Sequence, residues 1–105
     1  MLPIARLKNG LEISIQASHM HECTPKDDAG PWSSVEVGYP NKVIEELIPY
    51  AEDPKTPTKT TYNNVPAYLI KKIIDESGGL EFGLIPMLLI DEKVHFYWAN
   101  PIITK

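Results

Sequence analysis

The sequence has a single cysteine, Cys23, in 105 residues, so no internal disulfide can form and the fold depends on the burial of apolar side chains. Long hydrophobic runs are also missing. The longest, GLIPMLLI, falls far short of the roughly 20 residues that a membrane-spanning helix needs. The amino terminus does not show the basic start, apolar stretch and cleavage site of a signal peptide. We therefore expect a cytoplasmic protein without a membrane partner.

Positive charge is scarce as well. The chain has 10 Lys and Arg against 14 Asp and Glu, a formal net charge of −4, and no basic stripe. Nonspecific binding to nucleic acid depends on clustered Lys and Arg, so we expect no partner of this class. The length fits one domain, residues 1–105, which is large enough to bury a core of its own.

Period-two alternation of apolar and polar residues predicts two strands in the first third of the chain. One lies in LEISIQASHMHEC, after the turn signal Asn9-Gly10. The other lies in SSVEVGYP, where Val35, Val37 and Tyr39 share one face. The segment TPKDDAGPW between them is typical of a loop.

Two helices are predicted in the middle of the chain. The first begins at Asn41, a favourable N-cap, and ends at Pro49. The second begins near Pro66 and ends at Gly78. The connection AEDPKTPTKTTYNN has no helical period, so we expect it to be exposed, with a short extended piece at 60–62. The apolar stripes are Val43, Ile44, Leu47 and Ile48 in the first helix and Leu69, Ile70, Ile73 and Ile74 in the second.

The last third returns to strands. LIPMLLI, a turn at 91–93 and VHFYWAN together predict a hairpin, with Val94, Phe96 and Trp98 on one face. The order β-β-α-α-β-β predicts an α+β fold, a mostly antiparallel sheet with two helices packed on one face. Because LIPMLLI is apolar on both faces, we expect a homo-oligomer in which a second subunit covers it.

The stretch ASHMHEC places His19, His21 and Cys23 at every second position. If the first strand continues in register, all three lie on its inward face. Zinc would need further ligands, and alternate strand residues are roughly 7 Å apart, so we predict no metal. Core residues at the end of a strand are the favoured interpretation. A ligand pocket, a metal site and a cysteine nucleophile with His21 as its base are the alternatives; we assign no catalytic residue and no cofactor.

The segment TKTTYNN precedes the second helix, where free backbone N–H groups and the helix dipole favour an anion. It combines a cation, hydrogen-bond donors and an aromatic ring, which a nucleotide requires. A plain polar loop is the alternative. We expect two further residues to approach from the first loop. The predicted ligand-binding residues are Lys59, Thr60, Thr61, Tyr62, Asn63 and Asn64, together with His21 and Lys26.

The chain contains, in this order, the phrases NGLEISIQAS, HECTPK, SSVEVGYP, PYAED, TTYNNVP and SGG. Together they resemble a group of small accessory proteins encoded by tailed bacteriophages, with its Cys-Ser/Thr-Pro-Arg, Val-Glu-Val-Gly-Phe-Pro and Tyr-x-x-Val-Pro segments. The resemblance covers about residues 9–79. It departs at Lys26, where arginine is expected, at Tyr39 for phenylalanine and at Ser77 for histidine. It brings no activity with it.

The resemblance implies a protein that acts in the cytoplasm of a bacterial host by non-catalytic binding. Such a protein would serve host-defence evasion, either by sequestering a defence nucleotide or as an inhibitor that blocks a host protein. One alternative is a small metal-dependent or cysteine enzyme that uses His19, His21 and Cys23. Another is a component of virion assembly.

Overall fold

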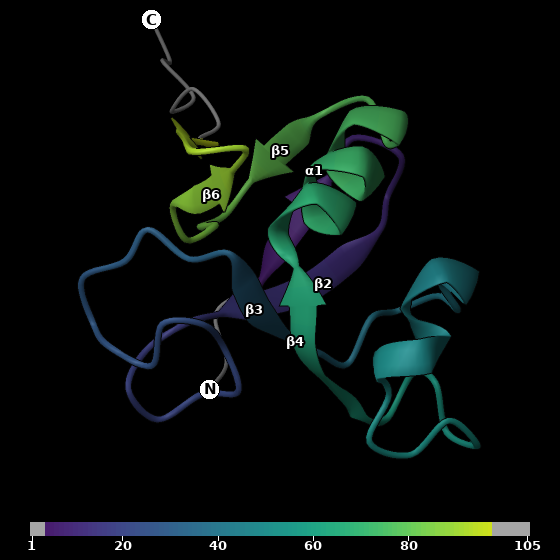
Figure 1. The fold of residues 1–105 in the computed structure, drawn as a ribbon. Coiled ribbons are helices and arrows are strands. Elements are labelled where there is room, and N and C mark those ends of the chain that lie inside the picture. Colours follow the sequence, from purple (N-terminus) through teal and green to yellow (C-terminus); the bar gives the residue numbers. More distant parts are fainter. Residues whose placement is uncertain (1–3, 98–105) are drawn as a thin grey trace, which may run out of the picture.

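A five-stranded antiparallel sheet in the order β4-β3-β2-β1-β5 forms the centre of the computed structural model, which describes residues 4–97 (Figure 1). A separate hairpin pairs β6 with β7. The fold is therefore α+β with a mostly antiparallel sheet, as predicted. The elements are β1 (Ala5–Leu7), β2 (Glu12–Gln16), β3 (Ser34–Gly38), the 3-10 helix η1 (Glu45–Tyr50), β4 (Thr61–Pro66), α1 (Ala67–Glu76), β5 (Leu80–Phe82), β6 (Leu88–Ile90) and β7 (Lys93–His95).

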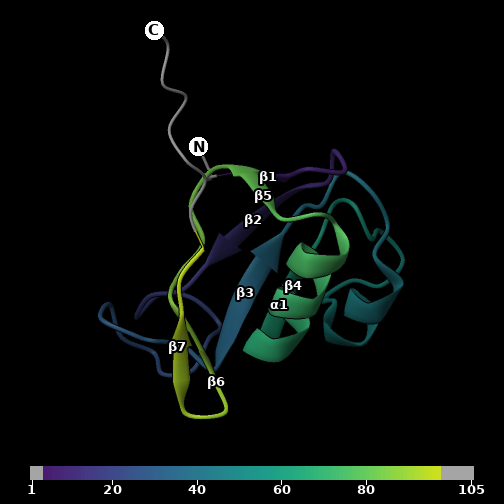
Figure 2. The ribbon, with the colours of Figure 1, turned by 90° about the horizontal axis from the view of Figure 1, so that it is seen from above.

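One face of the sheet is apolar and forms the core. Cross-strand pairs align its side chains: Ala5 lies opposite Ile13, and Val37 lies opposite both Ile15 and Tyr62. All five are buried. Figure 2 shows α1 lying over this face, and α1 also contacts β6 of the hairpin.

The opposite face of the sheet is polar. Arg6 of β1 pairs with Glu12 of β2 at 2.7 Å and with Glu81 of β5 at 2.9 Å. Gln16 lies opposite Glu36 on the neighbouring strand. A sheet with one buried and one polar face accounts for the period-two alternation in β2 and β3.

The two early strands are confirmed, with shorter bounds than the pattern predicts. Val35 and Val37 are fully buried on the core face. Tyr39 does not share that face: the chain leaves β3 at this residue with a φ of 48°, and its side chain is half exposed. The expectation for Tyr39 is therefore wrong.

The second helix is confirmed as α1, whose predicted apolar stripe is buried. Ser77 is its C-cap, and Gly78 follows with a φ of +86°, which lets the N–H of Gly79 donate to the carbonyl of Ile74 at 2.9 Å. No helix among residues 4–97 is long and apolar enough to cross a membrane.

The first helix is only the 3-10 helix η1, and two of its details differ from the prediction. Asn41 does not cap it. The Asn41 side chain instead accepts a hydrogen bond from the N–H of Glu12 at 2.8 Å and donates to the carbonyl of Gly10 at 3.1 Å, which ties it to β2. Pro49 lies inside η1 and does not end it. The prediction of two helices packed on one face is not confirmed, because residues 4–97 form one α-helix and one short 3-10 helix.

Three strands, β1, β4 and β5, are missing from the predicted order. β1 and β5 have three residues each, too few to show an alternation. β4 begins within a segment rich in threonine and asparagine, which the sequence predicts to be mostly loop.

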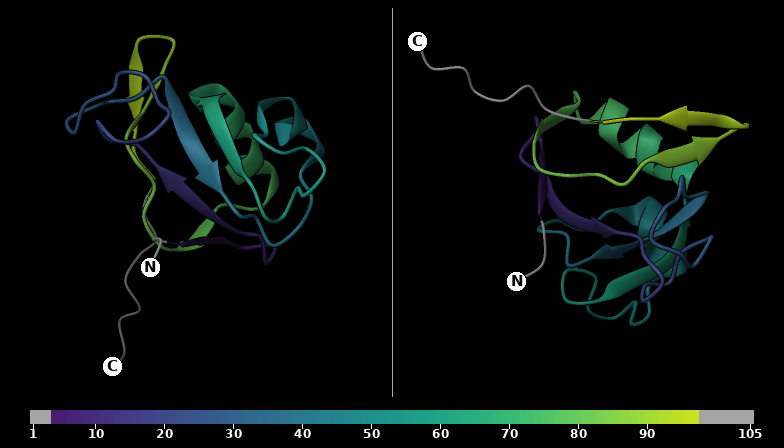
Figure 3. Two further views of the ribbon diagram at one scale, coloured as in Figure 1. Left: turned by 90° about the horizontal axis from the view of Figure 1, so that it is seen from below. Right: turned by 90° about the vertical axis from the view of Figure 1, so that its left-hand side faces the viewer.

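The late hairpin is confirmed, with shorter strands. Its turn uses Asp91 and Glu92, both at positive φ, and Figure 3 shows it standing apart from the large sheet. Val94 and Phe96 are exposed, and Trp98 lies outside the described residues. Of the LIPMLLI segment, Leu88 is buried within the chain itself, so self-association through this segment stays a prediction.

Candidate binding groove

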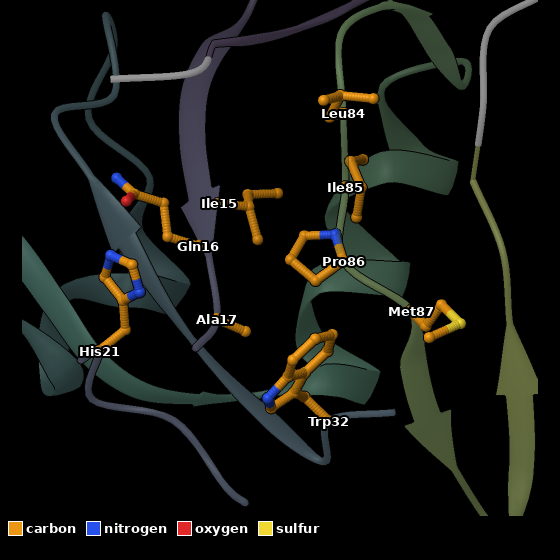
Figure 4. A pocket seen from close by; sticks show the side chains of 9 residues that line it. All are labelled: Ile15, Gln16, Ala17, His21, Trp32, Leu84, Ile85, Pro86 and Met87. Atoms are coloured by element: carbon orange, nitrogen blue, oxygen red, sulfur yellow. The ribbon is translucent and has the colours of Figure 1, made fainter. Parts of the chain in front are cut away.

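A groove with a volume of about 470 Å³ lies between the carboxyl end of β2 and the segment 84–87 that follows β5 (Figure 4). Most of its lining is hydrocarbon. The volume lies within the range of small-molecule and peptide-side-chain sites. The lining residues are Ile15, Gln16, Ala17, His21, Trp32, Leu84, Ile85, Pro86 and Met87.

The groove follows from the unequal lengths of the strands. β1 lies between β2 and β5, and its last pair toward the amino terminus joins Ala5 to Ile13. Beyond this pair β2 continues to Gln16, and the chain after β5 continues as 84–87. The groove therefore lies where a longer β1 would continue, between β2 on one side and the 84–87 segment on the other.

Trp32 forms one end of the groove and is held there by the backbone. The backbone N–H of Trp32 donates to the carbonyl of Met87 at 2.9 Å, and the backbone carbonyl of Trp32 accepts from the N–H of Leu89 at 2.8 Å. These bonds fix the loop before β3 against β6 and the residue that precedes it. Figure 4 shows the indole at the end of the groove, below Ala17 and Pro86.

The indole nitrogen of Trp32 is a buried donor without a hydrogen-bond acceptor among the described residues. The side chain is 6% exposed. A buried donor left without a partner costs about 1–3 kcal/mol. A ligand acceptor can reach this nitrogen only if the ring or its neighbours shift, because the atom itself is closed off from solvent.

His21 and Gln16 form a polar wall opposite the 84–87 segment (Figure 4). The Nδ1 atom of His21 lies 2.6 Å from the hydroxyl of Ser18, which already accepts the N–H of Met20 at 3.0 Å. This contact engages one ring nitrogen of His21 within the loop. The imidazole of His21 forms part of the groove lining.

The predicted row of His19, His21 and Cys23 on one strand face is wrong. β2 ends at Gln16, and the chain turns, with the N–H of His21 donating to the carbonyl of Ser18 at 3.2 Å. His19 is exposed and Cys23 is buried. Residues 4–97 contain no group of three or more His, Cys, Asp or Glu side chains placed to hold a metal ion.

His19 and Cys23 each bond to a different part of the loop. The backbone N–H of His19, and then its ring, donate to Asp28 and hold the pKa of that carboxyl below its ordinary value. The thiol of Cys23 donates to the carbonyls of Ser18, at 3.2 Å, and Pro25, at 3.4 Å. Cys23 therefore packs the loop and does not face the groove.

The expectation that Tyr62 is exposed is also wrong. Tyr62 is fully buried in β4, its hydroxyl donates to the carbonyl of Pro57, and burial raises its pKa. Thr60 is buried too, and its hydroxyl accepts from the N–H of Asp53 at 3.0 Å. Since the ring of Tyr62 belongs to the core, it offers no face on which a base could stack.

Three more residues of the TKTTYNN segment form hydrogen bonds within the protein. Thr61 and Asn63 both donate to Glu52, at 3.2 and 3.5 Å, and Asn64 accepts from Ser34 at 3.2 Å. The Glu52 carboxylate beside them disfavours an anion. Lys59 is exposed.

Two further observations weaken an anion site at this helix start. The first amide of α1, that of Ala67, donates to the carbonyl of Ser33 at 2.8 Å. Lys26 forms an ion pair with Glu22 at 3.1 Å and is not part of the groove lining. Of the eight predicted ligand residues, His21 alone lines the groove.

The sequence prediction missed the apolar part of the lining. Trp32 could be found only as one aromatic residue among several, because its place next to Met87 depends on a long-range pairing. The apolar run GLIPMLLI carried a signal, since it predicts more apolar surface than one hairpin can cover.

Comparison with protein-family models, with curated proteins and with solved structures finds no match to this chain.

Proposed function

We propose that this protein acts by non-catalytic binding and that its groove between β2 and 84–87 captures part of a partner. The observation that carries the proposal is the combination at one place of an apolar lining with the unpartnered indole N–H of Trp32. Apolar surface supplies affinity, and a few placed donors supply orientation.

The composition of the lining favours an uncharged ligand over a nucleotide. No Lys or Arg is among the lining residues. A phosphate group that entered the groove would lose hydration without gaining a counter-charge, and this is costly. An uncharged segment loses less hydration on entering the groove.

Inhibition of a protein is therefore the form of host-defence evasion that this groove supports best. That the partner belongs to a bacterial host is part of the proposal and rests on the sequence phrases alone. Two of these phrases contribute lining residues to the groove: NGLEISIQAS contains Ile15, Gln16 and Ala17, and HECTPK contains His21.

The test is a screen of uncharged fragments and blocked short peptides against the ¹⁵N-labelled protein. We expect compounds to shift the amide signals of Ile15 and Ala17 in a saturable way. Leu84→Arg should weaken this binding, because Leu84 is 76% exposed on the groove wall. Phe96→Arg is the matched control, since Phe96 is 71% exposed and outside the lining. A screen without any groove binder, or equal loss in both variants, would contradict the proposal.

A further inference from the structure

Among residues 4–97, nothing pairs with the end of β2 on its groove side. Along β2 the backbone groups alternate in direction. Those of Glu12 bond to Asn41 on the β3 side, and the carbonyl of Leu11 accepts from Leu7 on the β1 side. By this alternation the N–H and C=O of Ile15 point to the β1 side. Within residues 4–97 no strand lies there, because the β1 pairing stops at Ile13.

The position of the groove suits one added strand. It continues the row of β1, which is flanked on one side by β2 and on the other by β5 and the chain after it. Paired strands lie about 4.8 Å apart, so a chain in this row would be within hydrogen-bond distance of Ile15. Residues 15–17 extend for roughly three times 3.3 Å, enough for three or four peptide residues.

The two faces of the groove specify which side chains such a strand would carry. A residue opposite Ile15 would lie on the core face, where Trp32 and Ile85 offer apolar contact. A residue opposite Gln16 would lie on the other face, beside the polar wall with His21. The occupant should therefore alternate apolar and polar side chains.

We propose, on the basis of the binding function above, that the groove takes an extended segment of a partner protein as an added strand, antiparallel to β2. The backbone of the segment pairs with Ile15, and an apolar side chain of the segment packs against Trp32. This is recognition by strand addition, in which backbone bonds give affinity and the pockets give specificity.

Two other occupants fit less well. A second copy of this chain cannot bring its own β2 edge into the groove, because the segment 84–87 flanks that edge in each copy. The segment that precedes Ile4 in the sequence includes Pro3. A proline has no N–H to donate to the Ile15 carbonyl.

The test uses the full chain and a set of blocked pentapeptides that alternate threonine with valine, isoleucine or leucine. The matched control peptides carry a methyl group on the backbone nitrogen that pairs with Ile15, which removes the hydrogen-bond donor at that position. We expect slower hydrogen exchange at the Ile15 amide on peptide binding, and about tenfold weaker binding of the methylated peptides. Leu84→Arg should weaken binding, and Phe96→Arg should not.

The outcomes separate this inference from the proposed function. If small apolar fragments bind in the groove and the peptides do not, strand addition is wrong and the binding function stands. Equal affinity of methylated and unmethylated peptides would likewise overturn strand addition alone. An Ile15 amide that is already protected in the free protein would show that the chain fills its own groove, and this also overturns strand addition. If neither fragments nor peptides bind, both proposals fail.

Discussion

The indole ring of Trp32 packs directly on Gly30. A Cβ atom at position 30 would come within 2.5 Å of two ring carbons, and Gly30 has a φ of +63°. The close approach and the backbone conformation both require glycine here. Gly30 therefore fixes the ring that forms one end of the groove.

We expect Gly30→Ala to destabilise the protein by about 2–4 kcal/mol, because the methyl group displaces a buried ring and strains the backbone. Gly10→Ala is the matched control, since Gly10 has a φ of +91° with open space around its Cβ position. It should cost only the backbone strain, about 1 kcal/mol. Urea unfolding of both variants measures the difference. Equal losses would show that the ring is not held by Gly30.

The burial of Tyr62 gives a second prediction. Tyr62→Ala should cost about 3–5 kcal/mol because it leaves a cavity in the core. Tyr62→Phe should cost about 1–2 kcal/mol, since the carbonyl of Pro57 loses its donor. Tyr68, which is 62% exposed on α1, serves as the control, and its change to alanine should stay within about 0.5 kcal/mol. Thermal unfolding distinguishes these cases, and a folded, unperturbed Tyr62→Ala variant would contradict the placement in the core.

Local patterns predicted those elements whose sequence signal is long enough. α1 has two turns of apolar stripe with Gly78 after its end, and β2 has a clear alternation. The end of β2 was not predictable, because the turn after Gln16 depends on Ser18 bonds within the loop. The burial of Tyr62 depends on pairing with Val37, far away in sequence.

The groove was only partly predictable for the same reason. His21 could be named as a ligand residue, since imidazoles are common in sites. Its neighbours across the groove come from a different part of the chain, and only the sheet order brings them close. Trp32 bonds to Met87 and to Leu89 through one backbone hydrogen bond each, and neither bond leaves a trace in the local sequence patterns.

The ion pair between η1 and α1 makes a third prediction. Lys72 donates to Glu46 at 2.8 Å and lowers the pKa of that carboxyl. A lowered carboxyl pKa contributes stability above the unfolded-state value of about 4.3, and this contribution is lost as the pH falls through the folded-state value. Lys72→Met should therefore raise the pKa of Glu46 and flatten the acid limb of stability against pH.

Carboxyl chemical shifts followed by NMR titration measure this pKa. Lys71→Met is the control, because Lys71 pairs with Asp75 on its own helix. The Glu46 titration should stay unchanged in that variant. An unchanged Glu46 titration in Lys72→Met would show that the pair between η1 and α1 does not form in solution.

The indole N–H signal of Trp32 in a ¹⁵N–¹H spectrum tests the central claim most directly, since this buried donor without an acceptor is what marks the groove as a binding site. The chain has two tryptophans, and Trp32→Phe assigns the signal by its loss. We predict that a groove-binding peptide shifts this signal in proportion to saturation, because the peptide packs against the ring that forms one end of the groove. The account is contradicted if the peptide binds at saturation while the Trp32 indole signal stays where it is in the free protein.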